Sequence, residues 1–325
     1  MLIKILLVAF LISISTVFAV EPDYQAIIDQ AYDNYHYDNR GENANYIPAL
    51  AQVNPNYFAI ALITVDGKIY TAGATKVKFP LESISKVFNL ALVLQQFGNI
   101  EVLKKLGANA TGLPFNSILA VKLQPNHIGN PFVNAGAMAT VSMIKGNANQ
   151  KWTTISNNLN TYAGTTLEVN QVIDKSENET NQHNHAIAKL LEAYGKFYSD
   201  TSMAVDLYTK ACSVDVTVTD LAKMGVVLAN HGKSPYTHKQ ILQVNYVSNV
   251  LAVMATAGLY DTSGNWLYKV GLPAKSGVGG GILAIVPGKF AIAAFSPPLD
   301  ETGNSVRGQE AVQYIANQLK ANIFN

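Results

Sequence analysis

Ser83 and Lys86 are two residues whose types and spacing suggest nucleophilic catalysis. They stand three positions apart in FPLESISKVFNLALVLQQFG, where Pro80 precedes an apolar, helix-compatible stretch. A helix that starts there places the hydroxyl and the amine on one face. A serine hydroxyl needs a base to become a nucleophile, and a lysine serves when burial and nearby cations lower its pKa from about 10.4 toward 7. Alone, however, this motif is more often a helix cap followed by a solvated lysine.

A second motif, Lys275-Ser276-Gly277, lies in GLPAKSGVGGGILAIV just before a predicted strand. A cation, a hydroxyl and a backbone without Cβ can line a groove there and supply amide donors to an oxyanion. S-x-x-K at a helix start, combined with K-[ST]-G near a late strand, is the layout of the penicillin-recognising serine enzymes. The two motifs together predict a serine acyl-transfer enzyme.

Two hairpins are predicted at opposite ends of the chain, and they would position these motifs. The first spans 57–72 and turns at Asp66-Gly67, a dipeptide suited to the positive φ angles of a type I′ turn. The second joins GGILAIV to KFAIAAF through Pro287-Gly288. The segment 260–270 is predicted to end in a fifth strand, and 305–319 has helical spacing of its apolar residues.

Between the hairpins the pattern is helical. Helices are predicted over 85–97, 185–198 and 203–212, with a loop over 116–131. We therefore expect an α+β fold, in which an antiparallel five-stranded sheet with flanking helices carries an inserted all-helical lobe. The expected domains are a sheet lobe (20–95 and 240–325) and a helical lobe (96–239), with a ligand cleft between them.

The first nineteen residues have the pattern of a cleaved signal peptide. Lys4 precedes the apolar run 5–12, and Val17 and Ala19 suit the −3 and −1 positions of a cleavage site before Val20. The run is about half of the roughly 20 apolar residues that a membrane-spanning helix needs. We expect export, most simply to a bacterial periplasm, without a stable membrane anchor.

Composition excludes several other classes of protein. The net charge of +1, from 23 basic and 22 acidic residues, argues against a nucleic-acid binder. The single cysteine, Cys212, allows no intramolecular disulfide, and the six histidines are scattered without an HExxH pattern, so no metal site is expected. The glycine-rich stretch 277–281 leads into a strand, which does not fit a dinucleotide-binding or P-loop context.

Longer blocks give the chain a specific resemblance. It resembles the bacterial and animal glutaminases, serine-dependent enzymes of the β-lactamase-like fold, from about residue 46 to 308. The blocks are NYIPAL, FPLESISKVF, NPFVNAGAM, CSVDV, AGLYDTSG, GLPAKSGVGGGI and SPPLDETGNS.

The resemblance implies a role for each matching residue. Ser83 is the nucleophile, Lys86 its partner, and Tyr260 the tyrosine that hydrogen-bonds the nucleophile, while the N–H groups of Ser83 and Val278 form the oxyanion hole. Lys275 supports Tyr260. The implied substrate-binding set comprises Tyr46, Ser83, Asn134, Glu177, Asn184, Tyr208, Tyr260 and Val278. Within it, Glu177 suits the α-ammonium of free glutamine, and Asn134, Asn184 and Tyr46 suit its α-carboxylate.

Two positions depart from the family pattern. Glu82 stands where the family usually has glutamine, and a carboxylate there would raise the pKa of Lys86, so we expect Glu82 to point away or to pair with a cation. His183 replaces the arginine that usually precedes the asparagine at Asn184.

The resemblance therefore implies an exported glutaminase that converts L-glutamine to L-glutamate and ammonia through a Ser83 acyl-enzyme. No cofactor is needed, because lysine and tyrosine supply the proton transfers. We expect glutamine as the small-molecule partner and a homodimer or homotetramer as the assembly. The alternatives are a penicillin-recognising hydrolase, either a β-lactamase or a D,D-peptidase, and a catalytically silent binding protein of the same fold.

Overall fold

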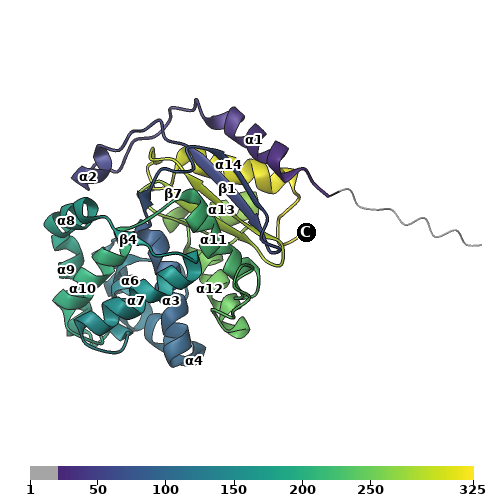
Figure 1. The fold of residues 1–325 in the computed structure, drawn as a ribbon. Helices are drawn as coiled ribbons and strands as arrows, with labels where there is room; N and C mark the ends of the chain where they lie inside the picture. Colours follow the sequence, from purple (N-terminus) through teal and green to yellow (C-terminus); the bar gives the residue numbers. More distant parts are fainter. Residues whose placement is uncertain (1–20) are drawn as a thin grey trace, which may run out of the picture.

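The computed structural model describes residues 21–325, so the segment 1–19, predicted to be a signal peptide, lies outside the described residues (Figure 1). A five-stranded antiparallel sheet has the order β2-β1-β8-β7-β6, which joins both ends of the chain. The strands are β1 (Ala59–Thr64), β2 (Ile69–Gly73), β6 (Ala274–Ser276), β7 (Gly281–Val286) and β8 (Phe290–Phe295). The predicted fold class, with its five-stranded antiparallel sheet, is confirmed.

The two predicted hairpins are present at their predicted turns. Gly67 has φ +89° and its N–H donates to the Thr64 carbonyl at 2.8 Å, which closes the β1–β2 turn. Gly288 has φ +74° in the β7–β8 turn. β1 pairs with β8 along its whole length, from Ala59 opposite Phe295 to Thr64 opposite Phe290. This pairing brings the two sequence-distant hairpins into one sheet.

Helices cover both faces of the sheet. On one face lie α1 (Tyr24–Tyr35), α13 (Ser263–Val270) and α14 (Val306–Gln318), which share an apolar cluster with the strands (Figure 1). On the other face lies α11 (Val218–Ala229). A Cβ at Gly225 of α11 would stand 2.5 Å from Leu283 Cδ1, so this glycine permits the close approach of helix and sheet.

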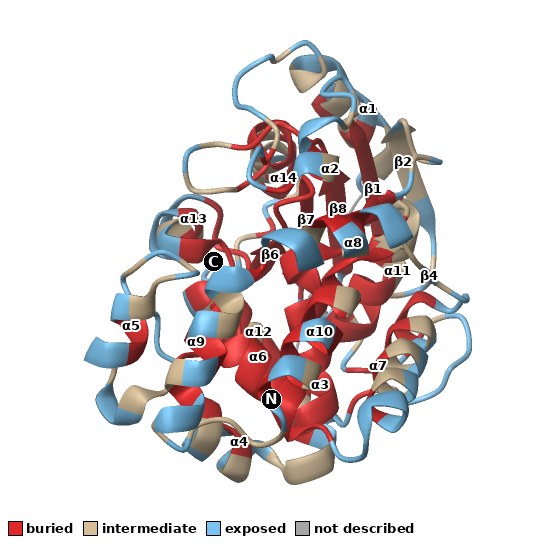
Figure 2. Cartoon of the chain, turned by 90° about the vertical axis from the view of Figure 1, so that its left-hand side faces the viewer, coloured by how far each residue is buried: buried red, intermediate tan, exposed pale blue. Residues whose placement is uncertain are grey.

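The remaining helices form one connected group that includes α3 (Ser85–Phe97), whose first ten residues are all buried (Figure 2). They are α2 (Pro48–Ala51), α4 (Asn99–Leu106), α5 (Ile118–Leu123), α6 (Asn134–Met143), α7 (Ala148–Ala163), α8 (Gln171–Thr180), α9 (Gln182–Ala193), α10 (Thr201–Cys212) and α12 (Val244–Ala257). One continuous apolar core runs from the sheet face through these helices. The two parts of the chain therefore meet across packed side chains.

Three local expectations were wrong. The segment 260–270 contains no strand but a 3₁₀ turn, η3 (Tyr260–Thr262), and then α13, whose buried Ser263, Trp266 and Val270 have helical spacing; the fifth strand is β6. The expected loop 116–131 contains α5, capped by the Ser117 side chain. Helix 185–198 runs instead over Gln182–Ala193 as α9.

The helical region is also not all-helical, because a second small sheet crosses it. Its order is β3 (Phe79–Pro80), β5 (Val214–Val216) and β4 (Glu168–Val169). Strands of two or three residues are too short to produce a readable alternation, which is why the sequence pattern did not predict them. In addition, α11 comes from the segment expected to form the helical lobe but lies on the large sheet. The expected domain boundaries remain predictions. Within residues 21–325, no helix has the length and apolar character required to cross a membrane.

Candidate active site

Ser83 lies on a tight turn between two packed elements. β3 ends at Pro80, the 3₁₀ turn η1 (Glu82–Ile84) follows, and α3 begins at Ser85. Glu82 adopts φ +49°, a conformation uncommon for a residue other than glycine, and the Ser85 hydroxyl bonds to its carbonyl at 2.7 Å. This conformation places Ser83 directly before the helix, with 5% of its surface exposed.

Lys86, one helical turn after Ser83, is a buried lysine without an ion-pair partner among the described residues. Its Nζ donates hydrogen bonds to Asn134 Oδ1 at 2.7 Å and to the Phe132 carbonyl at 3.3 Å. Burial lowers the pKa of Lys86 to about 8, although nearby Cys212, Glu82 and Glu177 oppose this shift. Roughly a tenth of this amine is therefore uncharged at pH 7, far more than in an ordinary lysine.

Tyr260 approaches Ser83 from η3, and it too has a left-handed backbone, with φ +54°. Burial raises the pKa of Tyr260 above its ordinary value, and its hydroxyl donates a hydrogen bond to the Ser276 carbonyl at 3.4 Å. Lys275 Nζ lies 4.2 Å from the centre of the Tyr260 ring, and Phe115 packs against the same ring at 4.6 Å. These contacts fix the Tyr260 ring, and its hydroxyl lies near the Ser83 side chain, which lowers the pKa of Tyr260 in part.

The glycine-rich segment after β6 lies against the turn that carries Ser83. A Cβ at Gly277 would stand 2.7 Å from the Leu81 carbonyl oxygen, and one at Gly279 would stand 3.0 Å from that of Pro80. Among residues 21–325, the N–H groups of Ser83 and of Val278 have no hydrogen-bond acceptor. Two free backbone donors on adjoining segments suit the stabilisation of an oxyanion.

A polar network joins Lys86 to three of the predicted substrate-binding residues. Asn134 Oδ1 accepts the hydrogen bond from Lys86 and another from the Tyr208 hydroxyl at 3.2 Å. Asn134 Nδ2 donates to Asn184 Oδ1 at 3.0 Å. The structure thus brings together residues from α3, α6, α9 and α10 around one amide.

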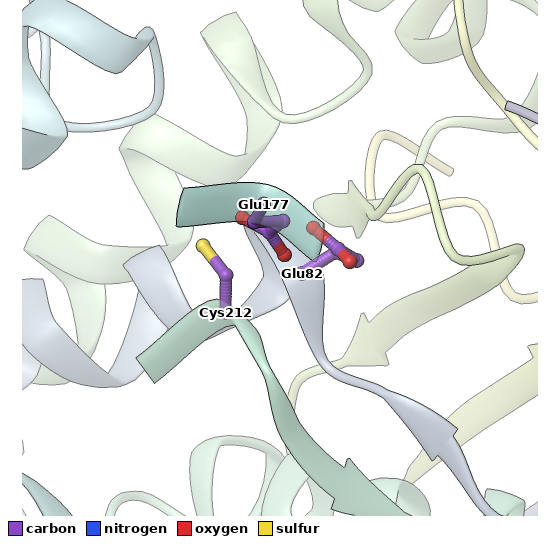
Figure 3. Close-up of side chains that lie close together, drawn as sticks. All are labelled: Glu82, Glu177 and Cys212. Carbon is purple, nitrogen blue, oxygen red and sulfur yellow. The ribbon is translucent and has the colours of Figure 1, made fainter. Parts of the chain in front are cut away.

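Glu82 does not point away and does not pair with a cation, so both expectations for it were wrong. It is 3% exposed, and its carboxyl group lies beside Glu177 of α8 and Cys212 of α10, with donor atoms of all three within 4.8 Å of one another (Figure 3). Burial raises the pKa of Glu82 to about 7 and raises that of Glu177 well above its usual range. The side chain of Glu82 points into the protein because its backbone is left-handed.

These three side chains form the one grouping of possible metal ligands within residues 21–325. Burial raises the pKa of the Cys212 thiol well above its usual range, so the sulfur is held in the protonated form. The two carboxylates offer the oxygen acceptors that an ammonium group, with its three N–H donors, needs.

Tyr46, on the loop before α2, also belongs to the predicted substrate-binding set. About half of the surface of Tyr46 is exposed, but its hydroxyl is buried. This burial raises the pKa of Tyr46, and the neighbouring Tyr260 raises it further.

Sequence reasoning did not select Phe115, whose carbonyl accepts the Asn134 N–H at 2.8 Å, or Asn304, whose side-chain oxygen accepts the Ser276 hydroxyl at 2.6 Å. Asn304 stands within SPPLDETGNS, whereas no motif marks Phe115.

His183, the second departure from the family pattern, reaches the Asn116 carbonyl through Nε2 at 2.6 Å. This contact ties the start of α9 to the loop before α5. The neighbouring Asn184 remains hydrogen-bonded to Asn134 despite the replacement.

Comparisons with known proteins agree with this geometry. A family model described as "Glutaminase" matches residues 41–324. A glutaminase of Colwellia psychrerythraea is 52% identical over 305 residues, which cover 94% of this chain and 98% of that protein. Glutaminase 1 of Escherichia coli K12 is 50% identical over 301 residues, covering 92% of this chain and 97% of that protein.

Solved structures give the same result. One described as a probable glutaminase superposes with a TM-score of 0.91 at 49% identity and covers 93% of this chain and 98% of its own. A probable glutaminase from Bacillus subtilis, solved in complex with 6-diazo-5-oxo-L-norleucine, gives 0.85 at 29% identity, with 94% and 99% covered. This chain therefore belongs to the glutaminase family, serine-dependent hydrolases of β-lactamase-like fold that act on the amide of glutamine.

Proposed function

We propose that this glutaminase works through an acyl-enzyme on Ser83. The observation that carries the proposal is the position of buried Ser83 one helical turn before a buried lysine, whose Nζ bonds only the neutral oxygens of Asn134 and Phe132 within residues 21–325. Burial lowers the pKa of this lysine to about 8. An uncharged lysine removes a serine proton, whereas an ammonium does not. Both groups lie on rigid, buried elements that fix their geometry.

The reaction has two halves. Ser83 Oγ attacks the side-chain carbonyl carbon of glutamine while its proton passes to Lys86, and the oxyanion accepts hydrogen bonds from the N–H groups of Ser83 and Val278. The C–N bond then breaks, and the nitrogen leaves as ammonia with a proton delivered through Tyr260. Water attacks the γ-glutamyl ester by the reverse relay, which releases glutamate and restores the Ser83 hydroxyl.

Recognition of free glutamine follows from the polar groups around the nucleophile. Glu177 faces the α-ammonium, and the amides of Asn134 and Asn184 with the Tyr46 and Tyr208 hydroxyls face the α-carboxylate. A glutamine inside a peptide lacks both charges and would leave these groups unpaired, at about 1–3 kcal/mol for each buried group. The proposal therefore restricts the substrate to the free amino acid.

The Bacillus subtilis structure offers a direct test, because 6-diazo-5-oxo-L-norleucine has the glutamine skeleton with a diazomethyl group in place of the amide nitrogen. Incubated with the present protein, it should alkylate Ser83 with loss of dinitrogen. Peptide mass mapping should find the adduct on the peptide containing Ser83, and the Ser83→Ala variant should show none.

The same variant should lose ammonia release from glutamine by several orders of magnitude. Full activity in Ser83→Ala would overturn the mechanism. A nitrocefin assay beside the ammonia assay distinguishes the penicillin-recognising alternative, which requires nitrocefin turnover, and glutamine affinity without ammonia would indicate the silent binding protein.

We also propose that the chain is exported to the periplasm and acts there as a homodimer or homotetramer. Lys4, the apolar run 5–12 and the small residues Val17 and Ala19 support export. Cell fractionation and N-terminal sequencing test this proposal, which expects a mature chain that begins at Val20. Light scattering on that mature chain measures the assembly, and a monomer at working concentration would contradict the oligomer.

A further inference from the structure

Buried Glu82 and partly buried Glu177 form a carboxyl pair beside the nucleophile, at one end of the proposed substrate pocket, because Glu82 directly precedes Ser83. Glu82 comes from η1 and Glu177 from α8, and the two side chains converge (Figure 3). Oε1 of each residue is buried and has no hydrogen-bond partner among the described residues. Buried acceptors without partners are costly, so this pair is built to receive something that the empty protein does not supply.

The groups that face the carboxyl pair come from every element packed around it. These groups comprise one cation, one further carboxylate, and four hydroxyl or thiol groups that are neutral near pH 7. They are Lys86 of α3, Asp174 of α8, Tyr208 and Cys212 of α10, Tyr46 of the preceding loop, and Tyr260 of η3.

Lys86 does not neutralise the carboxyl pair by contact. Its Nζ is bonded to Asn134 and to the Phe132 carbonyl, and no salt bridge joins it to either carboxylate within residues 21–325. Two like charges that share a buried site cannot both be ionised cheaply, so one proton must remain on the pair when the pocket is empty.

We propose that Glu82 and Glu177 act together as the receptor for the α-ammonium of the substrate and that they share one proton, which is released when the ammonium binds. Glu82 is then a second specificity-determining carboxylate beside Glu177. The ammonium brings a positive charge and three N–H donors to the unpaired oxygens, and it therefore replaces the proton in function.

This inference rests on the proposed function, since it assumes that the α-amino group of glutamine enters this end of the pocket. It adds a measurable linkage between substrate binding and proton release. As pH rises through the titration of the empty pair, the ammonium no longer has to displace a proton, so the affinity for amino-acid ligands rises. A site with a single low-pKa carboxylate would show no such change near neutral pH.

Isothermal titration calorimetry with L-glutamate, the product, measures this linkage without turnover. Titrations near neutral pH in buffers of different ionisation enthalpy give the number of protons released on binding. The wild-type protein should release a substantial fraction of one proton. Glu82→Gln, which keeps the shape of the side chain but leaves a single carboxyl group, should release clearly less.

Two matched controls isolate the effect. Glu179→Gln removes an exposed carboxylate of the same helix, one that pairs with Lys175 at 3.8 Å, and should leave proton release at the wild-type value. Glutarate has both carboxylates of glutamate but no ammonium, and it should bind without releasing a proton.

The outcomes separate the two proposals. Proton release at the wild-type value in Glu82→Gln, or equal release with glutarate, would overturn the carboxyl-pair receptor while leaving the Ser83 mechanism intact. If glutamate binds outside this pocket, so that Asn134→Ala and Glu177→Gln do not weaken it, the proposed site itself fails. The KM of Glu82→Gln for glutamine should also vary less with pH between about 6 and 8 than that of the wild-type enzyme.

Discussion

Lys86 Nζ donates a 2.7 Å hydrogen bond to Asn134 Oδ1, and Asn134 Nδ2 in turn donates to Asn184. The proposed base and the proposed carboxylate-binding amides are therefore one connected unit. A neutral amide oxygen orients the lysine without stabilising its charged form as strongly as a carboxylate would. The identity of residue 134 thus controls both substrate binding and the protonation of the base.

Asn134→Asp should inactivate the enzyme near neutral pH. The new carboxylate would lie against the amine and raise the pKa of Lys86 from about 8, by about one unit or more. Activity that remains should appear only at higher pH. Measurement of kcat against pH checks this prediction, and Asn134→Ala, which adds no charge, should not shift the profile to higher pH.

The wild-type pH profile follows from the same group. Lys86 must be uncharged to accept the Ser83 proton, so kcat should fall as pH falls through the pKa of Lys86, which is about 8 in the free protein. A kcat that stays constant down to pH 4 would show that Lys86 is not the base.

Much of this site follows from the sequence because it rests on short-range relations. Ser83 and Lys86 are three residues apart, so a helix alone fixes their common face. The hairpins follow from their turn residues in the same way. The conformation of Glu82 does not, because a left-handed backbone at a residue other than glycine is imposed by the packing of β3 and α3 around it.

Glu82→Gln should raise the stability of the protein at neutral pH. Burial raises the pKa of Glu82 from 4.5 to about 7, so the folded state holds a proton that the unfolded state has lost. Stability is therefore complete below about pH 4.5 and decreases as pH rises toward 7. The amide of Glu82→Gln cannot ionise, so it should raise the free energy of unfolding at neutral pH by ~1–3 kcal/mol. Urea unfolding at pH 5 and pH 8 measures the difference, and an equal gain at both pH values would refute the linkage.

Gly277→Ala should reduce kcat by about 10- to 100-fold, because its Cβ would lie 2.7 Å from the Leu81 carbonyl oxygen and would push the Val278 N–H away from Ser83. The matched control is Gly264→Ala on α13, where a Cβ would meet nothing within 4 Å. Steady-state kinetics on both variants, with circular dichroism to verify folding, makes the comparison. Equal activity in the two variants would remove the oxyanion role of this segment.

Tyr260→Phe removes only the hydroxyl that lies near Ser83. The ring packing against Phe115 and beneath Lys275 is retained, so the variant should fold with a melting temperature close to that of the wild type. Without the hydroxyl, no group beside Ser83 delivers a proton to the leaving nitrogen, and kcat should fall by about 10²–10⁴. KM should change much less, because Asn134, Asn184 and the carboxyl pair still hold the substrate.

A γ-glutamyl ester or thioester substrate tests the assignment of Tyr260 as proton donor. Its leaving group needs little protonation, so this substrate should restore most of the rate that Tyr260→Phe loses. If the variant were equally slow on the activated ester, Tyr260 would serve to position Ser83 and would not be the proton donor.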